Sequence, residues 1–211
     1  MNFLSYFWPQ KIASFHSAYN GEIKVIEFLR SRYIESGGLM QSGKFLEKLY
    51  QKGINKLKIP DDGIKQILVL GLGGGSVIKV LQKKFNYCQI TGVDIDEMMV
   101  NAGKKYLGLG DIKDLQIIIS DANDFIEQDQ NKYDLIFVDL YKGYDIPAQF
   151  ETLDFFKKLQ QLKTENGYVI FNRLYIQSHV FEASKFLDKL KNLFHYVNTA
   201  KIYSNLLICV K

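Results

Sequence analysis

Cysteine and histidine are scarce in this sequence of 211 residues. The two cysteines, Cys88 and Cys209, show neither metal-ligand nor redox spacing, so we expect buried, unpaired thiols in a reducing compartment. The three histidines, His16, His179 and His195, are scattered along the chain, and we expect them at structural or surface positions. We therefore expect no metal site.

A long apolar run and a dense basic tract are also missing. Met1–Phe15 is aromatic, but it has no basic start and Pro9 interrupts it, so we expect neither a secretory signal nor a membrane span and place the protein in the cytoplasm. The 27 basic residues face 23 acidic ones, for a formal net charge of +4, and are spread thinly. We therefore expect neither a nucleic-acid nor a membrane partner.

The sequence does have enough hydrophobic residues, 47%, to form one substantial core. The pattern of predicted elements changes near Ile59–Gly63. This change divides the chain into an N-terminal segment, 1–60, and a main domain, 61–211. In the N-terminal segment, Glu22–Phe28 and Arg32–Glu35 are β-rich runs separated by a short polar break, which predicts a β-hairpin.

The residues that follow this hairpin have the spacing of a helix. Phe45, Leu46 and Leu49 recur at helical intervals, which predicts a helix over Ser42–Lys58. This helix leads into the main domain.

From Lys65 onward, β-rich runs alternate with amphipathic stretches, a pattern typical of a parallel sheet with helices on both faces. The predicted parallel strands are Gln66–Leu70, Gln89–Val93, Leu115–Ile119, Asp134–Val138 and Gly167–Asn172. The predicted helices are Gly75–Phe85, Glu97–Tyr106, Gln149–Leu162 and Ser178–Asn192, the last capped by Ser178. The final runs, Phe194–Thr199 and Asn205–Val210, lie so close in sequence that they must pair antiparallel. The fold class is therefore α/β and Rossmann-like, with a mostly parallel seven-stranded sheet that ends in an antiparallel hairpin.

The strongest motif is a buried strand that runs into glycines and then a helix, Ile67 to Ser76. Gly71, Gly73 and Gly75 allow a tight turn and let the backbone approach a ligand, and free N–H groups at the helix start offer donors. The alternative is a loop that uses glycine only to turn. A dinucleotide-binding loop needs glycine where Ser76 stands, so the pattern favours a different nucleoside ligand.

Acidic residues follow several of the predicted strands. Asp94 ends one apolar run beside Ile95, where a carboxylate can accept both hydroxyl hydrogens of a ribose, whereas Asp96 is better placed to cap the next helix. Asp139 ends the central strand, next to the expected reactive end of the ligand. A carboxylate there can act as a general base or hold a cation. The alternative is a solvated loop aspartate.

Together these motifs resemble the spermidine synthase family and its methyltransferase-like relatives, from about Gly21 onward. The triplet Gly73–Gly75 is similar to that family in particular. The resemblance implies that Gln41 lies over the cofactor, that Asp121 and Ala122 read the adenine, and that the protein forms a homodimer. For Asp121 the alternative is a cap on the helix starting at Asn123.

Three departures from the family bear on the reaction. Where aminopropyltransferases have aspartate after the glycines, this chain has Ser76, which favours a donor that keeps its own carboxylate. Where the catalytic loop has a second aspartate, this chain has Lys142, which would repel a polycation. The family's tyrosine-histidine-glutamate triplet is replaced by Glu47–Tyr50.

We therefore expect a methyltransferase that binds S-adenosylmethionine and acts on a small-molecule acceptor. Asp139 and Tyr141 are the expected catalytic residues facing the acceptor, and Asp139 also contributes to cofactor binding. The first alternative is an aminopropyltransferase that uses decarboxylated S-adenosylmethionine, with Asp139 as base. The second is a catalytically silent nucleoside-binding protein.

Overall fold

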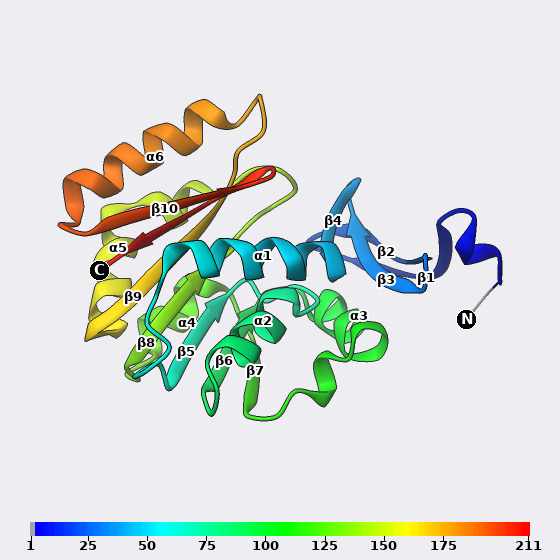
Figure 1. Cartoon of the computed structure of the whole chain (residues 1–211), viewed down its shortest axis with the longest axis horizontal. Coiled ribbons are helices and arrows are strands. Elements are labelled where there is room, and N and C mark those ends of the chain that lie inside the picture. The colour runs from blue at the N-terminus through cyan, green and yellow to red at the C-terminus, as the bar shows by residue number, and fades with distance from the viewer. Residues whose placement is uncertain (1–2) are drawn as a thin grey trace.

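The computed structural model describes residues 3–211 and contains two sheets (Figure 1). The larger sheet occupies one end of the molecule, the smaller lies near the N-terminus at the other end, and helix α1 (Lys44–Leu57) runs between them. Met1 and Asn2, the start of the segment in which no secretory signal is expected, lie outside the described residues.

The smaller sheet has four antiparallel strands in chain order. After a short 3-10 helix, η1 (Phe3–Tyr6), its strands are β1 (Gln10–Ser17), β2 (Gly21–Phe28), β3 (Ser31–Ser36) and β4 (Leu39–Gly43). The pairing of β2 with β3 confirms the predicted hairpin, whereas β1 and β4 were not predicted. Gln41 is part of β4.

The larger sheet has the predicted seven strands, in the order β10-β11-β9-β8-β5-β6-β7. They are β5 (Gln66–Leu70), β6 (Gln89–Asp94), β7 (Leu115–Ile119), β8 (Tyr133–Val138), β9 (Lys163–Leu174), β10 (Val197–Ile202) and β11 (Asn205–Val210). The pairs among β5 to β9 are parallel, and β11 pairs antiparallel with both β9 and β10. The Rossmann-like fold class and its C-terminal hairpin are therefore confirmed.

Helices cover both faces of the larger sheet, which is why its central strands are apolar on both sides. One face carries α1 and α2 (Ser76–Lys84) over a core that includes Ile67, Val69 and Phe137. The other carries α4 (Ala122–Gln128), α5 (Leu153–Leu162) and α6 (Val180–Leu193). Both cysteines are buried and free.

Helix α3 (Glu97–Leu107), followed by the short 3-10 turn η2 (Leu109–Asp111), joins the two sheets. Met99 and Ala102 pack against Ile23, Val25 and Ile34 of the smaller sheet.

Asp96 caps α3, as predicted. Its Oδ1 accepts hydrogen bonds from the N–H groups of Met98 and Met99, at 3.0 and 3.2 Å. Its Oδ2 accepts bonds from the Ser17 hydroxyl and the Asn20 amide, at 2.5 and 2.6 Å. One carboxyl group therefore connects the turn after β1 to the start of α3.

Two helix predictions were wrong in detail. The predicted helix Gln149–Leu162 is broken, because a 3-10 turn, η3 (Ala148–Glu151), precedes Thr152, and the Thr152 hydroxyl caps α5 by accepting the Phe155 N–H at 3.2 Å. Ser178 does not cap α6, since its hydroxyl contacts the ring of His179, the residue at the cap position, at 2.8 Å.

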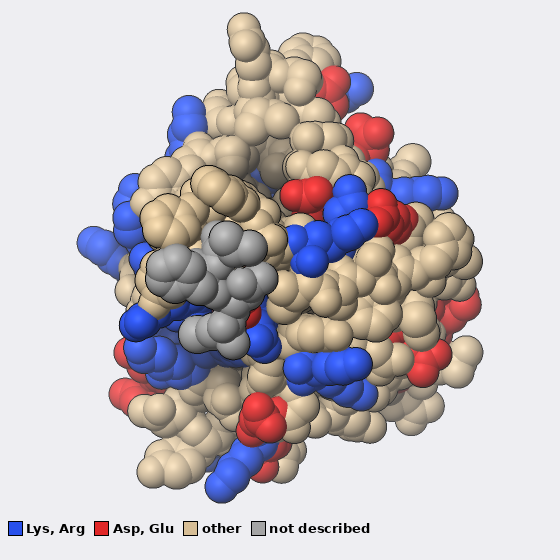
Figure 2. Space-filling model, turned by 90° about the vertical axis from the view of Figure 1, so that its right-hand side faces the viewer, with Lys and Arg blue, Asp and Glu red and all other residues tan. Residues whose placement is uncertain are grey.

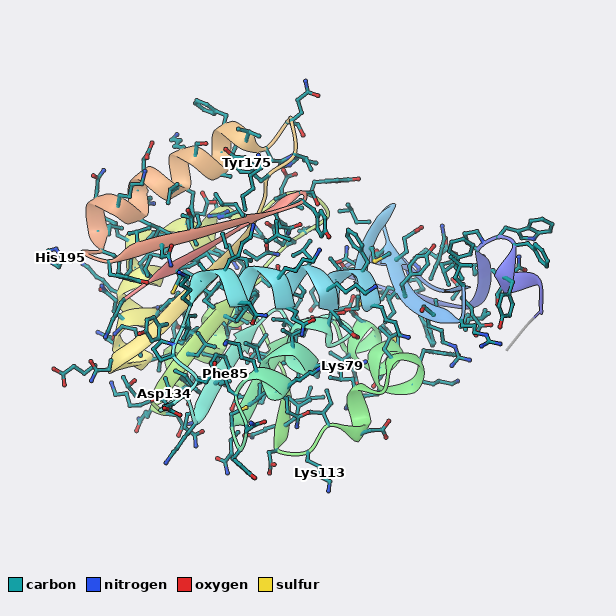
Figure 3. The ribbon with its side chains drawn as sticks, in the orientation of Figure 1. Lys79, Phe85, Lys113, Asp134, Tyr175 and His195 are labelled. Atoms are coloured by element: carbon teal, nitrogen blue, oxygen red, sulfur yellow. The ribbon has the colours of Figure 1, made fainter. Side chains whose placement is uncertain are left out.

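Charged residues of both signs are interspersed on the face that the smaller sheet presents (Figure 2). Glu22 there pairs with Lys11 and Lys24, and Arg32 pairs with Glu27. Figure 3 shows Asp134 at the amino end of β8, where its carboxylate accepts the backbone N–H groups of Lys65 and Gln66 as β5 begins. Within residues 3–211, no helix has the length and apolar character needed to cross a membrane.

Candidate functional site

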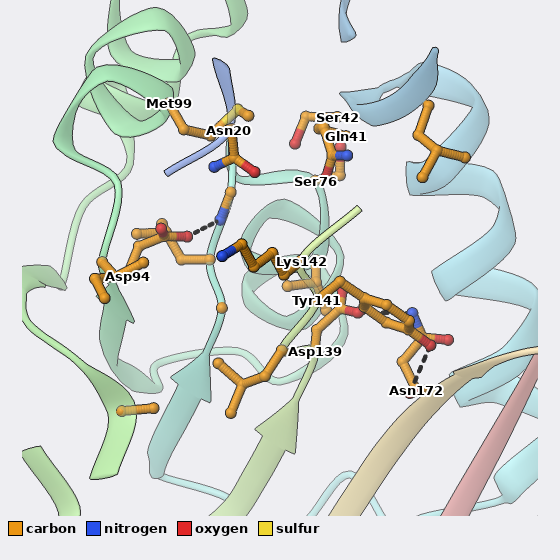
Figure 4. A pocket seen from close by; sticks show the side chains of 18 of the residues that line it. Asn20, Gln41, Ser42, Ser76, Asp94, Met99, Asp139, Tyr141, Lys142 and Asn172 are labelled. Atoms are coloured by element: carbon orange, nitrogen blue, oxygen red, sulfur yellow. Dashed lines mark hydrogen bonds between the residues drawn. The ribbon is translucent and has the colours of Figure 1, made fainter. Parts of the chain in front are cut away.

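A cavity of about 570 Å³ opens where the parallel strands of the larger sheet end (Figure 4). Its floor is formed by the carboxyl ends of β5, β6, β7, β8 and β9, and β4 with the start of α1 forms its upper wall. Of the predicted site residues, Gln41, Gly71, Gly73, Asp94, Ile95, Asp121, Ala122, Asp139 and Tyr141 line it. Ligands of open α/β sheets bind at this edge.

Gly71 and Gly73 form the rim of the cavity with backbone alone. Gly71 has a φ of +85°, and a Cβ on it would lie 2.2 Å from the carbonyl oxygen of Asp139. No side chain fits there, so glycine is required for β5 and β8 to end side by side. Gly73 also has a left-handed φ, of +54°, and its N–H points to Asp94.

Gly75 packs against a neighbouring side chain. It does not line the cavity, and a Cβ on it would lie 2.5 Å from the Leu109 side chain. Its small size therefore serves packing against Leu109, and its approach to the cofactor remains a prediction.

The upper wall is fastened to the glycine loop by two serine hydroxyls. The Ser42 hydroxyl accepts the Gly74 N–H at 2.9 Å, and the Ser76 hydroxyl accepts the Gly43 N–H at 2.8 Å. Gln41 precedes Ser42 in β4, so its predicted place over the cavity is consistent with this geometry.

Asp94 is held rigidly at the end of β6. Its Oδ2 accepts the Gly73 N–H at 2.6 Å and its Oδ1 accepts the Asp96 N–H at 2.9 Å. Burial raises the pKa of Asp94, and these backbone hydrogen bonds oppose the rise. The carboxylate is thus oriented before any ligand arrives, and it retains lone pairs for the ribose hydroxyls expected there.

Asp121 both caps a helix and faces the cavity. Its Oδ1 accepts the Asn123 N–H at 2.7 Å, so Asp121 does cap helix α4, which was the alternative to a role in ligand binding. Its Oδ2 lies 3.5 Å from the Gln149 amide, on the cavity side. The contact of Asp121 and Ala122 with an adenine ring remains a prediction.

Asp139 is the centre of a hydrogen-bonded network at the end of β8. The Tyr50 hydroxyl donates to its Oδ2 and the Asn172 amide to its Oδ1, both at 2.7 Å. Asn205 donates in turn to Asn172 at 2.9 Å. Burial raises the pKa of Asp139, while the bonds from Tyr50 and Asn172 lower it. Asp139 is therefore an oriented carboxylate and not a solvated loop residue.

Tyr141 lines the cavity, but its hydroxyl is occupied. The hydroxyl accepts the Leu174 N–H at 2.7 Å and donates to the Asn172 carbonyl at 3.2 Å. Burial and the nearby Asp139 carboxylate raise the pKa of Tyr141 well above its ordinary value of 10.0. The geometry therefore indicates that this hydroxyl positions the loop after β8 and does not transfer a proton.

Sequence reasoning missed Tyr50 and Asn172. Tyr50 sits on the buried face of α1, where it reads as an ordinary core residue. Asn172 offered a signal, because a polar residue at the carboxyl end of an apolar strand next to β8 must lie at the ligand edge.

The described histidines lie outside this site. In the described part of the chain no histidine lines the cavity, and His195 lies at the end of the molecule opposite the smaller sheet (Figure 3). Among residues 3–211 no group of three or more His, Cys, Asp or Glu side chains is arranged to hold a metal ion.

The sequence matches the model of the spermine/spermidine synthase domain over residues 47–208. It is 27% identical over 111 residues to a probable polyamine aminopropyl transferase of Bifidobacterium longum, covering 53% of this chain and 24% of that protein. It is 28% identical over 166 residues to a polyamine aminopropyltransferase of Saccharolobus solfataricus, covering 70% and 52%. The chain thus spans at most about half the length of these relatives. The fold is that of Thermotoga maritima spermidine synthase, with a TM-score of 0.78 at 16% identity over 95% of this chain and 72% of that one.

The expectation of a methyltransferase was wrong, because the matching family and these relatives are aminopropyltransferases. The expectation rested on Ser76 and Lys142, which stand where aminopropyltransferases have aspartates. In the structure the Ser76 hydroxyl is bonded to the backbone of Gly43, so it helps to attach β4 and α1 to the glycine loop. A match over most of the chain, together with the same two-sheet fold, leads to one conclusion: the chain belongs to the spermine/spermidine synthase domain family.

Proposed function

We propose that this chain transfers the aminopropyl group of decarboxylated S-adenosylmethionine to an amine. The observation that carries the proposal is the Asp139 network, an oriented and partly buried carboxylate beside the glycine loop. Family membership supports the same reaction, and its extension to this chain is the proposal, because the chain spans only part of its relatives.

The residues at the strand ends fit such a donor. Gly71 and Gly73 present only backbone to it along the rim, and Asp94 is oriented to accept the hydroxyls of its ribose. Asp121 and Ala122 would hold its adenine, and Gln41 would close the cavity from above. The donor itself supplies a carbon activated by a sulfonium.

The chain's own part in the reaction is to position the amine and remove a proton. An amine enters as an ammonium ion, which is not nucleophilic until it loses a proton. Asp139 is placed to accept that proton, and its raised pKa makes it a better base than an exposed aspartate. Tyr50 and Asn172 each hold one of its two oxygens, which fixes the orientation of the carboxylate in the cavity wall.

The direct test is to incubate the protein with decarboxylated S-adenosylmethionine and a panel of primary amines, and to measure methylthioadenosine. We expect methylthioadenosine to form in proportion to the aminopropylated amine. Calorimetry with the same donor, run in parallel, reports binding alone. Donor binding without product for any amine would overturn the proposal and leave the silent nucleoside-binding alternative.

Tyr50→Phe should move the acidic limb of the pH–rate profile to higher pH. The Tyr50 hydrogen bond lowers the pKa of Asp139, so its loss raises that pKa, and the carboxylate form disappears at a higher pH than in the wild type. A hydrogen bond to a charged group contributes about 1.5–3 kcal/mol, which corresponds to a shift of roughly one to two pH units. The measurement is kcat against pH. Tyr87→Phe is the matched control, because Tyr87 is 98% exposed, and a shift of equal size in that variant would contradict the assignment.

A further inference from the structure

Asn205 is a buried polar residue in the cavity wall, one contact away from the residue that holds Asp139. It begins β11 opposite Leu174 of β9, two residues along from Asn172 and on the same face of the sheet. Its Nδ2 donates to Oδ1 of Asn172 at 2.9 Å, and its Oδ1 accepts the Ser204 hydroxyl at 3.2 Å. Both ends of the buried Asn205 amide are therefore bonded.

The charge of Asp139 dictates the direction of these bonds. An ionised carboxylate only accepts hydrogen bonds, so the Asn172 side chain must turn its NH2 group to Oδ1 of Asp139, at 2.7 Å. The oxygen of the Asn172 amide then faces Asn205, which must donate to it. The oxygen of Asn205 in turn faces Ser204, whose hydroxyl must donate. The three bonds therefore run in one direction and end on the carboxylate.

Asn172 by itself could present either end of its amide to Asp139. With its oxygen toward Asp139, it would accept a bond from the protonated, neutral carboxyl and so favour the form that cannot take up a proton. That orientation would set the NH2 group of Asn172 against the NH2 group of Asn205, two donors with no acceptor between them. Reversal therefore requires both buried amides to turn together.

Titratable groups also face Asp139 from other elements. Tyr50 of α1 donates to its second oxygen, and Tyr141 lies beside it with the charges of Arg173 and Glu151 nearby. Among the described residues, the other ionisable side chains of the cavity lining are Tyr19, Asp94, Asp121 and Lys142. Asn172 differs from all of these, because its bond to Asp139 comes from a group that does not titrate.

We propose that Asn205 is a positioning residue for the transfer reaction: it holds the NH2 group of Asn172 toward Asp139 and so keeps this buried carboxylate ionised. The inference rests on the proposed function, in which Asp139 is the base. Burial favours the neutral form of Asp139 and raises its pKa, whereas the Asn172 bond lowers it, so the direction of that bond sets the pH at which the base becomes active. Bonds that share one direction also polarise one another inside a protein.

The test is kcat against pH for Asn205→Leu, measured as methylthioadenosine formation with the best amine of the panel. Leucine has a similar branched shape but cannot donate, so Asn172 loses the partner that orients it. The acidic limb of the profile should move to higher pH by about half a pH unit to one. The position of this limb does not depend on the fraction of the protein that folds. Asn198→Leu is the matched control, because Asn198 lies on the neighbouring strand β10, outside the cavity lining, and donates to the Leu57 carbonyl.

A double-mutant cycle shows whether Asn205 acts through Asn172. Asn172→Leu removes the bond to Asp139 and should move the acidic limb by itself, and adding Asn205→Leu should then move it no further. Shifts that add in the double variant, no shift in Asn205→Leu, or an equal shift in Asn198→Leu would each overturn the inference and leave the proposed function intact. No methylthioadenosine from wild-type protein that binds the donor would instead refute the proposed function and the inference with it.

Discussion

Replacing Asp139 with Asn is expected to lower kcat by roughly 10²- to 10⁴-fold, the usual contribution of a general base. Asn has the same shape and can keep both neighbours, since its oxygen can accept from Asn172 while its amide donates to the Tyr50 hydroxyl. The affinity for the donor, measured by calorimetry, should change little. A variant with near-wild-type turnover would remove Asp139 from the reaction.

The same variant should change how stability depends on pH. Burial raises the folded-state pKa of Asp139 above its ordinary 3.8, so in the wild type this group's contribution to stability is fully present below pH 3.8 and is lost as pH rises through the folded pKa. The asparagine side chain of Asp139→Asn does not titrate. The melting temperature of the variant should therefore rise relative to that of the wild type as pH rises, which thermal unfolding measures. Asp145→Asn is the matched control, because the Asp145 side chain is 89% exposed and lies in the same loop.

Asp94→Ala is expected to weaken donor binding by about 100-fold or more. Hydrogen bonds to a charged acceptor contribute about 1.5–3 kcal/mol each, and the variant loses the two expected from the ribose. It also frees the Gly73 N–H, so the glycine loop loses the group that orients it. Calorimetric titration with decarboxylated S-adenosylmethionine measures the loss. Asp62→Ala, at an exposed position outside the cavity lining, is the control, and equal affinities in the two variants would contradict the assignment.

The larger sheet was predictable because its strands are continuous apolar runs, which both covered faces require. The strands β1 and β4 of the smaller sheet could not be predicted from the sequence, for physical reasons. β1 is mostly polar and has one buried residue among eight, and β4 is five residues long and ends in Gly43, so neither has the pattern of a buried strand. Their pairing depends on β2 and β3, which bring them into the sheet.

The candidate site was predictable where it follows strand ends. Asp94, Asp121 and Asp139 each end a parallel strand or follow it directly, and such ends meet at one edge. Tyr50 reaches the site from a helix 89 positions away in the chain, a contact that local patterns do not encode. The bond between Ser76 and the backbone of Gly43 could not be predicted, because Gly43 comes from a strand that the sequence did not reveal.

The carboxyl group of Asp96 has a consequence for the motions of the molecule. It bonds the β1–β2 turn and the first turn of α3, while its own N–H is held by Asp94. A fluctuation that lifts the β1–β2 turn therefore disturbs the support of the Asp94 carboxylate. The smaller sheet and the end of β6 should thus open as one cooperative unit, so that a ligand bound at Asp94 slows amide hydrogen exchange in β1 and β2, far from its own contacts.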